Sequence, residues 1–289
     1  MSFNVAQYIK LARPQQWLKN LFILLPLFFS GQLDNLSLLG QSLVVAIGFS
    51  LIASSIYILN DCMDYKSDQE HPHKRNRPIA SGKITLKSAA KYMATLTTLG
   101  LIILMITAPK TILITILYIS ENIFYTLKGK HIPIVDITCI AIGFCLRVWI
   151  GAIACQLQLT PWIVLLTFFL ALFLGIHKRI GDTRISLKSK IKITLYTLPF
   201  LKMISGIISS VIIVIYISYT ISEDTIIKMG SSTLYISSLF VVMGLMRVNY
   251  LSIQSKSSNL DPTHLLIKDA VMKWIVIGWV LSYAAVLYI

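Results

Sequence analysis

Asparagine and aspartate side chains recur at helical spacing in the stretch YILNDCMDYKSDQEHPHKRNRPIASG, residues 57–82. Asn60, Asp64 and Asp68 follow one another at intervals of four residues, which on a helix places all three on one face. Such oxygen ligands suit Mg²⁺, which keeps several waters and is usually shared with substrate phosphates. We therefore expect Asn60, Asp64 and Asp68 to bind Mg²⁺. Asp61 lies one step around the helix and is expected, with Asp68, to support this site, so Asp61, Asp64 and Asp68 are the predicted catalytic residues.

A basic run follows these acids directly and contains His71, Lys74, Arg75 and Arg77. Metal-binding acids beside phosphate-binding bases indicate recognition of a diphosphate. Tyr57 extends the acidic face into the apolar run and is expected to donate to a phosphate or a ribose. The alternative is an ordinary solvated loop with helix-capping acids. We disfavour it, because the acids begin inside an apolar helix, where an unpaired charge is costly.

A second cluster, YTLKGKHIPIVD at residues 125–136, follows the fourth apolar run. Tyr125 and Lys128 stand three residues apart and share a helical face, so both are predicted to bind substrate. Lys130 and His131 follow. The alternative, a short basic loop that membrane topology alone requires, stays open.

Arg147 lies inside the apolar run 133–155. Helical spacing places it on one face with Asp136, Gly143 and Gly151. An arginine at that depth should face the interior of a helix bundle and have a partner. We expect the partner to be a substrate phosphate, with the two glycines making room for it. The alternative is a buried ion pair with Asp136 through a neighbouring helix.

The third cluster, GIHKRIGDTRISLKSK at residues 175–190, holds one acid among many bases. Lys178 and Asp182 are four residues apart on one helical face, and Arg179 is adjacent. This balance predicts a cradle for additional phosphate charge rather than a second metal site. A basic flank that ends a membrane span is the alternative.

The segment RPQQWLKN, residues 13–20, precedes the first apolar run. Lys19 is predicted to add a further phosphate contact. Trp17 and Arg13 are expected to anchor the segment in the lipid headgroup layer, where amphipathic side chains gather.

The elements that must position these residues are membrane helices. Of the 289 residues, 56% are hydrophobic and 13% are charged, about half the charged fraction of a soluble domain. Several apolar runs reach the roughly 20 residues that cross a bilayer, where backbone groups must be paired within the segment. We predict one all-α membrane domain over residues 1–289, with residues 1–17 as an interfacial amphipathic segment. The nine predicted transmembrane helices are 18–33, 37–59, 87–107, 110–126, 133–155, 160–177, 195–219, 231–250 and 271–289.

The net charge of +14 follows this topology. Lysine and arginine concentrate before the first predicted span and after the second, fourth, sixth and eighth. The positive-inside rule then predicts a multi-pass protein of the bacterial inner membrane whose N-terminus and polar clusters face the cytoplasm. The expected partners are the bilayer and phosphorylated substrates rather than nucleic acid.

The pattern NxxxDxxxD at residues 60–68, after the second of nine spans, resembles the UbiA superfamily of intramembrane prenyltransferases over the whole chain. Within it, the runs RPQQWLKN, HPHKRNRPIASG, LKGKHIPIVD, GFCLRVWIGA, HKRIGD and DPTHLLIKD are similar to the decaprenyl-phosphate phosphoribosyltransferase branch. Ordinary members carry a second DxxxD motif after the sixth span, and this chain has HKRIGD there, with the single acid Asp182.

The resemblance implies a nine-helix bundle with an active-site cavity facing the cytoplasm. It implies Mg²⁺-dependent transfer of 5-phosphoribose from 5-phosphoribosyl 1-diphosphate to a polyprenyl phosphate of the decaprenyl type, with a link to cell-wall biogenesis. One alternative is a UbiA enzyme that moves a prenyl group from prenyl diphosphate to an aromatic acceptor. Another is a transporter of anionic solutes, which the gathering of charge at one face and the lack of repeat halves disfavour.

Overall fold

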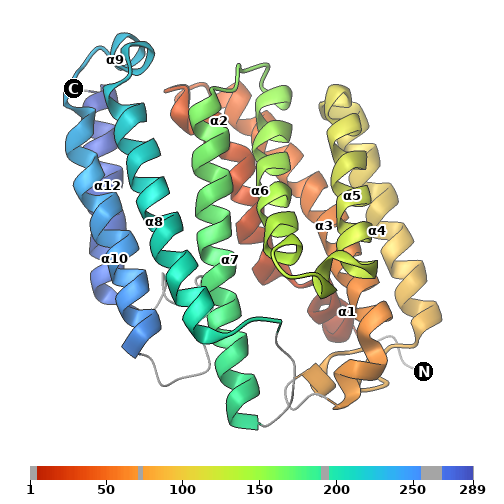
Figure 1. Cartoon of the computed structure of the whole chain (residues 1–289). Helices are drawn as coiled ribbons and strands as arrows, with labels where there is room; N and C mark the ends of the chain where they lie inside the picture. Colours follow the sequence, from red (N-terminus) through yellow and green to blue (C-terminus); the bar gives the residue numbers. More distant parts are fainter. Residues whose placement is uncertain (1–4, 71–73, 190–194, 255–268, 289) are drawn as a thin grey trace. The chain divides into compact units, whose positions relative to one another are not determined.

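The computed structural model describes residues 5–70, 74–189, 195–254 and 269–288, and its regular elements over these residues are helices (Figure 1). The predicted basic residue His71 and the segment 261–268 lie outside this range. The chain divides into two compact units. Unit 1 comprises residues 1–130 and 143–159, and unit 2 comprises residues 131–142 and 160–289.

Unit 1 is built around one long helix and its neighbours. Its elements are α1 (Val5–Ala12), η1 (Pro14–Leu24), α2 (Leu25–Phe29), α3 (Leu36–Glu70), η2 (Lys74–Asn76), α4 (Leu86–Thr107), η3 (Pro109–Thr111), α5 (Ile112–Leu127) and the part of α6 (Val135–Ala154) from Gly143 onward. The short η4 spans Gly129–His131. Unit 2 holds the start of α6, then α7 (Pro161–Ser189), α8 (Leu198–Ile221), α9 (Glu223–Met229), η5 (Thr233–Ser237), α10 (Ser238–Gln254) and α12 (Ala270–Tyr288).

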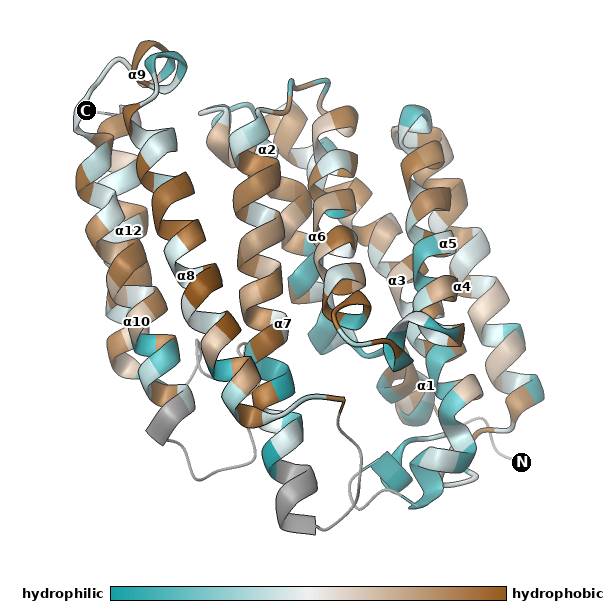
Figure 2. Ribbon diagram, viewed as in Figure 1, coloured by the Kyte–Doolittle hydropathy of each residue, from teal (hydrophilic) through white to brown (hydrophobic). Residues whose placement is uncertain are grey.

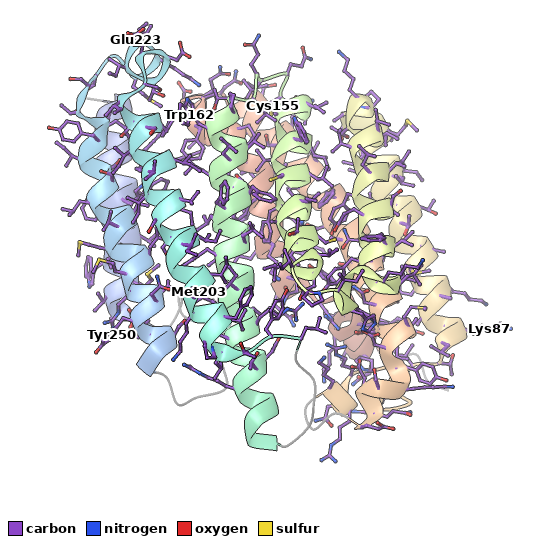
Figure 3. The ribbon with its side chains drawn as sticks, viewed as in Figure 1. Lys87, Cys155, Trp162, Met203, Glu223 and Tyr250 are labelled. Atoms are coloured by element: carbon purple, nitrogen blue, oxygen red, sulfur yellow. The ribbon has the colours of Figure 1, made fainter. Side chains whose placement is uncertain are left out.

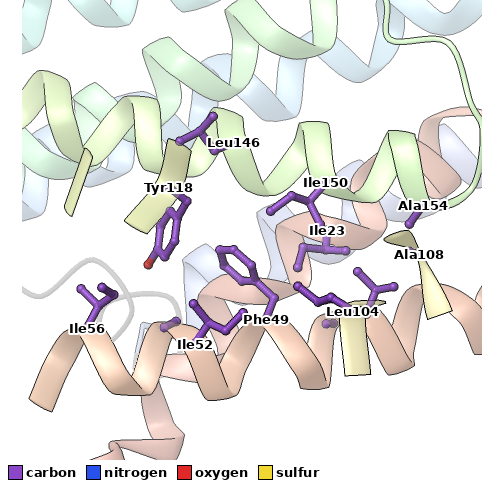
Figure 4. Packing of buried hydrophobic residues seen from close by; sticks show 13 residues of the cluster. Ile23, Phe49, Ile52, Ile56, Leu104, Ala108, Tyr118, Leu146, Ile150 and Ala154 are labelled. Atoms are coloured by element: carbon purple, nitrogen blue, oxygen red, sulfur yellow. The ribbon is translucent and has the colours of Figure 1, made fainter. Parts of the chain in front are cut away.

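The core of unit 1 lies between α3 and the helices that pack on it (Figure 4). Phe49 of α3 contacts Tyr118 of α5, with ring centroids 4.6 Å apart. Ile150 of α6 and Ile23 of η1 are fully buried in the same cluster. Lipid tails are as apolar as these side chains, so close packing rather than escape from water holds such helices together.

The core of unit 2 joins α7 and α8 to α10 and α12. Phe173 and Ile176 of α7 pack with Leu201 of α8, and all three are almost fully buried. Val248 of α10 and Met272 of α12 close the cluster. Each of these four helices therefore contributes buried apolar side chains to one core within the unit.

Six helices are long and apolar enough to cross a bilayer, counted over the described residues. They run over 36–70, 86–107, 135–154, 161–184, 198–221 and 233–252. The other three predicted spans are helical, but two of them are shorter α-helices and the first is mostly a 3₁₀ helix. Residues 14–29 form a 3₁₀ helix that becomes α-helical one residue before Pro26. Helix α5 has 16 residues, about 24 Å, and α12 contributes the shorter apolar stretch 270–286.

Large apolar side chains face outward along these helices, as lipid contact requires. Ile106 of α4 is 77% exposed, and Val214 of α8 and Met246 of α10 are similarly open. Figure 2 shows hydrophobic colours along α3 that give way to hydrophilic ones at its C-terminal end and in η2. In unit 2, α7 changes in the same way towards its own C-terminal end.

Successive helices run in alternating directions within each unit. In unit 1, Lys87 at the start of α4 and Cys155 after α6 lie at opposite ends (Figure 3). In unit 2, Trp162 at the start of α7 and Glu223 at the start of α9 lie at one end, and Tyr250 near the end of α10 lies at the other. This alternation is that of a chain crossing a membrane repeatedly.

Candidate active site

The predicted acidic face belongs to a single uninterrupted helix. Helix α3 continues past its apolar run to Glu70, so the helical spacing assumed for Asn60, Asp64 and Asp68 is confirmed. The helix also carries Tyr57 one turn before Asp61, where the tyrosine is half-buried against the unit 1 core.

The three side chains of this helix that were predicted to bind Mg²⁺ have different partners. Asn60 accepts a hydrogen bond from the Thr126 hydroxyl of α5. The carboxylate of Asp64 pairs with the ammonium group of Lys130. The carboxylate of Asp68 lies 2.6 Å from Nη1 of Arg77. The site therefore joins the end of α3 to the end of α5 and to the segment after η2.

Asp61 is held by two guanidinium groups. It pairs with Arg13, and Nη1 of Arg77 lies 3.0 Å from its Oδ1. The side chains of Asp61 and Asp68 are 2% and 4% exposed, whereas that of Asp64 is 34% exposed. A buried carboxylate needs such partners because desolvation is costly. The catalytic roles predicted for Asp61, Asp64 and Asp68 stay predictions, and Asp64 is the most open of these three aspartates.

Arg13 and Trp17 have polar partners on α3, and the prediction that they anchor η1 in the headgroups stays a prediction. Besides pairing with Asp61, the Arg13 guanidinium lies 5.5 Å from the Tyr57 ring centre. The Trp17 indole donates to the Ser54 hydroxyl at 2.9 Å. These contacts fix the start of η1 against the middle of α3.

Arg147 is buried, as predicted, and its partners are neutral. Its Nε donates to Asn20 Oδ1 at 2.8 Å, its Nη1 to the Gly143 carbonyl at 2.7 Å, and its Nη2 to the Tyr118 hydroxyl at 3.0 Å. Three aromatic rings surround the guanidinium, with that of Tyr118 nearest at 4.9 Å. The alternative pair with Asp136 is wrong, because Asp136 pairs with Arg179. Phosphate binding by Arg147 stays a prediction.

Glu121 of α5 is an acid that the sequence reasoning missed. A Cβ built on Gly143 would lie 3.8 Å from its Oε2 and 3.4 Å from Nη1 of Arg147. The Asn122 amide donates to the same carboxylate at 2.8 Å. A lone acid inside the apolar run 110–126 was the available signal, the same one that identified Arg147.

The remaining predicted residues of unit 1 differ in their exposure. Lys74 in η2 and Lys128 after α5 are exposed, and Lys19 and Tyr125 are half-buried. The lysine that reaches an acid of α3 is Lys130 rather than Lys128. Spacing alone did not distinguish the two.

Unit 2 holds its own charged cluster at the end of α7. Nε of Arg179 lies 2.8 Å from Oδ2 of Asp136, and its Nη1 lies 3.2 Å from Asp182. The Tyr196 hydroxyl donates to the other oxygen of Asp136. Lys178 is exposed beside them. The predicted cradle thus contains an arginine bracketed by two acids, one of which comes from the start of α6.

Two further polar contacts of unit 2 were not predicted. The buried His177 ring lies 3.2 Å from the Asn249 amide oxygen, which also accepts from the Ser205 hydroxyl at 2.6 Å. Asp269 accepts from Arg247 at 2.8 Å and from the Met272 amide at 2.7 Å, capping α12. The hydrogen bond from Arg247 holds the pKa of Asp269 below its usual range.

The donor set at the end of α3 suits a hard divalent cation with few protein ligands. Over the described residues, no three histidine, cysteine, aspartate or glutamate side chains converge as a metal site. Asn60 and Asp64 nevertheless present oxygens on one face, and Mg²⁺ commonly takes one or two carboxylates plus substrate phosphates. The residues therefore fit a metal shared with a phosphorylated ligand better than a closed protein cage.

Proteins named decaprenyl-phosphate phosphoribosyltransferase are similar to this chain over nearly its full length. The one from Mycolicibacterium smegmatis is 27% identical over 98% of this chain and 93% of its own. That from Corynebacterium glutamicum is 26% identical over 97% of this chain and 86% of its own. One from Mycobacterium tuberculosis is 24% identical over 97% of this chain and 94% of its own.

A solved structure shares the fold. The structure of a UbiA homolog from Archaeoglobus fulgidus bound to GPP and Mg²⁺ superposes with a TM-score of 0.72, at 18% identity, over 98% of this chain and 100% of that one. The family model described as the UbiA prenyltransferase family matches residues 21–275. The resemblance read from the sequence is therefore confirmed, the chain is a transferase, and it belongs to the UbiA prenyltransferase family.

Proposed function

We propose that this protein transfers 5-phosphoribose from 5-phosphoribosyl 1-diphosphate to a polyprenyl phosphate and releases diphosphate. The observation that carries this proposal is the full-length similarity to three proteins named decaprenyl-phosphate phosphoribosyltransferase. The charge distribution agrees with it. The donor has a 5-phosphate in addition to its diphosphate, and the chain offers one acidic helix face together with surplus lysines and arginines.

The acidic face of α3 receives the diphosphate end of the donor. Asn60 and Asp64 would hold Mg²⁺, which neutralises charge on the leaving diphosphate. The ammonium group of Lys130 pairs with the Asp64 carboxylate. When the donor binds, we expect this ammonium group to leave Asp64 and to pair with a phosphate oxygen. The other proposed phosphate or ribose contacts are Lys19, Tyr57, Lys74, Arg77, Tyr125, Lys128, Arg147, Lys178, Arg179 and Asp182.

The reaction exchanges one bond at the anomeric carbon of the ribose. The bond from C1 to the diphosphate oxygen breaks, and a bond from C1 to an oxygen of the polyprenyl phosphate forms. Positive charge develops on the sugar ring while the basic side chains stabilise the departing anion. The acceptor is already an anion, so the chain needs no general base.

The proposed setting is the bacterial inner membrane, with nine spans and with the N-terminus and a site cavity facing the cytoplasm. The positive-inside distribution of lysine and arginine supports this orientation. The lipid tail of the acceptor would enter from the bilayer, which leaves its phosphate at the membrane boundary beside the polar end of α3.

A prenyl transfer to an aromatic acceptor is the second candidate. Solved structures titled as UbiA homologs bound to GPP and DMAPP share the fold. The cluster at the end of α7 argues against it, because Arg179 lies between the acids Asp136 and Asp182. A second carboxylate pair open to a metal is therefore missing at this place in the described part of unit 2.

Replacement of Asp64 tests the metal role directly. We expect Asp64→Asn to lower transfer of labelled phosphoribose to polyprenyl phosphate by at least about 100-fold, with the protein still folded, because the Asp64 side chain is 34% exposed. Excess chelator should have the same effect on the unaltered protein. Asp34→Asn, an exposed acid before α3, is the matched control and should keep full activity. Full activity of Asp64→Asn or of the chelated protein would remove the metal role.

A donor competition separates the two candidate functions. Purified protein in detergent with polyprenyl phosphate should consume 5-phosphoribosyl 1-diphosphate and release diphosphate. The same preparation with prenyl diphosphate and an aromatic acid should release none. The reverse pattern would replace the proposed function with prenyl transfer.

A further inference from the structure

Three segments of unit 2 meet at one buried carboxylate. Asp136, in the first turn of α6, is 1% exposed, and both of its oxygens are engaged. Oδ2 lies 2.8 Å from Nε of Arg179 in α7. Oδ1 accepts from the hydroxyl of Tyr196, which precedes α8. A chain of polar contacts therefore runs from Tyr196 through Asp136 to Arg179.

The Tyr196 hydroxyl is itself held in place. It accepts a hydrogen bond from the backbone amide of Ile134. Ile134 has a φ of 71°, a left-handed conformation that is strained for a β-branched residue. Such strain persists only where the surroundings impose it, and it is found more often at functional sites than elsewhere. The bond to Tyr196 is one of the contacts that impose it.

Arg179 is fixed on two sides and remains accessible. Its Nε faces Asp136, its Nη1 lies 3.2 Å from Asp182, and its side chain is 22% exposed. The planar guanidinium binds phosphate through two parallel N–H donors, so the strength of this interaction depends on the orientation of the group. Contacts that set this orientation before a ligand arrives reduce the entropy lost on binding.

We propose that Tyr196 and Asp136 are positioning residues that orient Arg179 for a phosphate of the donor. This inference rests on the proposed function, in which Arg179 contacts substrate. A buried ion pair can also serve the fold alone. A role in orienting Arg179 predicts weaker donor binding when the Tyr196 hydroxyl is removed and its ring is kept. A role in the fold alone predicts unchanged donor binding.

Tyr196→Phe makes this separation. The ring stacks on Phe200 at 6.0 Å between centroids, and phenylalanine keeps that contact. We expect KM for 5-phosphoribosyl 1-diphosphate to rise roughly five- to tenfold, the effect of one lost hydrogen bond, with a smaller change in kcat. Tyr219→Phe is the matched control, since it removes a buried hydroxyl bonded to Tyr283 at 2.9 Å and should leave KM unchanged.

A double-mutant cycle tests whether Tyr196 acts through Arg179. Arg179→Lys should raise KM, because lysine lacks the fork, and adding Tyr196→Phe should raise it little further. Independent, multiplicative effects would overturn the proposal, as would an unchanged KM in Tyr196→Phe. Asp136→Asn should raise KM in the same way, and it replaces Tyr196→Phe as the test if Tyr196→Phe does not fold. An unaltered protein that does not consume the donor would instead remove the proposed function.

Discussion

Exposure separates the three aspartates of α3 more clearly than their residue type does. Asp61 and Asp68 are enclosed and share Arg77, whereas Asp64 keeps a third of its side chain open. The enclosed pair holds the segment after η2 against the helix. Asp64 is left as the carboxylate that a ligand can reach without dismantling an arginine contact.

Loss of Arg77 should destabilise the fold rather than only the reaction. Arg77→Gln leaves two buried carboxylates with fewer partners, and breaking such pairs costs about 3 kcal/mol. We expect a clear fall in the thermal unfolding temperature in detergent. The exposed neighbour Arg75, replaced by glutamine, is the control and should behave as the unaltered protein. Equal unfolding temperatures for the two variants would contradict the proposed role of Arg77.

Arg147 should tolerate no conservative replacement. The ammonium group of lysine cannot meet Asn20, Gly143 and Tyr118 together, so Arg147→Lys should lose about 2–4 kcal/mol of stability. Thermal unfolding and donor KM, measured on the same preparation, report the two roles separately. An unchanged unfolding temperature with a raised KM would mean that the phosphate contact matters and the internal contacts do not.

The placement of residues could be predicted from sequence where it depends on local spacing. The shared face of Asn60, Asp64 and Asp68 follows from the helical repeat, and the burial of Arg147 follows from its apolar surroundings. The partners of Asp61 could not be predicted, because Arg13 lies 48 positions away along the chain. Only the fold brings these two side chains together.

Among the elements, η1 is the unusual one. It is a 3₁₀ helix of 11 residues, whereas such helices rarely exceed four. Its close approach to α6 depends on Gly151, where a Cβ would lie 1.9 Å from the Ile23 carbonyl oxygen. The apolar run at 18–33 predicted a helix here but not its 3₁₀ form, and Trp17 and Asn20 of η1 donate hydrogen bonds to serine side chains of α3.

A methyl group at Gly151 should displace η1. We expect Gly151→Ala to lower the free energy of unfolding by about 3 kcal/mol, the upper range for overpacking. The variant should yield little monodisperse protein by size-exclusion chromatography. Gly206→Ala on α8 is the control, because nothing lies within 4 Å of the added carbon. Gly206→Ala should raise the free energy of unfolding by up to about 1 kcal/mol, because alanine has the higher helix propensity. Normal yield and unfolding of Gly151→Ala would show that η1 can move without cost.

At the scale of the whole molecule, the membrane topology is a prediction from the places where lysine and arginine gather. Nine apolar runs and their flanking lysines and arginines could be read from sequence, and helices occupy each run. Whether the three shorter helical segments cross the bilayer depends on lipid thickness and on neighbouring helices. The distribution of charge therefore predicts the direction of the long helices, but it does not predict the number of crossings.

Cysteine labelling tests the proposed orientation. A membrane-impermeant maleimide added to intact cells should label Glu223→Cys and leave Lys87→Cys unlabelled until the membrane is opened. Three of the four native cysteines are buried and Cys62 is half-buried, so the unaltered chain gives the background. Labelling of Lys87→Cys in intact cells would invert the topology.

The partners at the end of α3 also fix how the site responds to salt. Asp61, Asp64 and Asp68 are matched by Arg13, Arg77 and Lys130, so this group of side chains is electroneutral before a ligand binds. The proposed donor carries a 5-phosphate as well as a diphosphate, so one Mg²⁺ leaves it with a net negative charge. Its long-range attraction to the site therefore comes from cations outside this balanced group, such as the exposed Arg75 and Lys128, and salt screens that attraction. Donor capture by this chain is thus expected to weaken as the ionic strength rises.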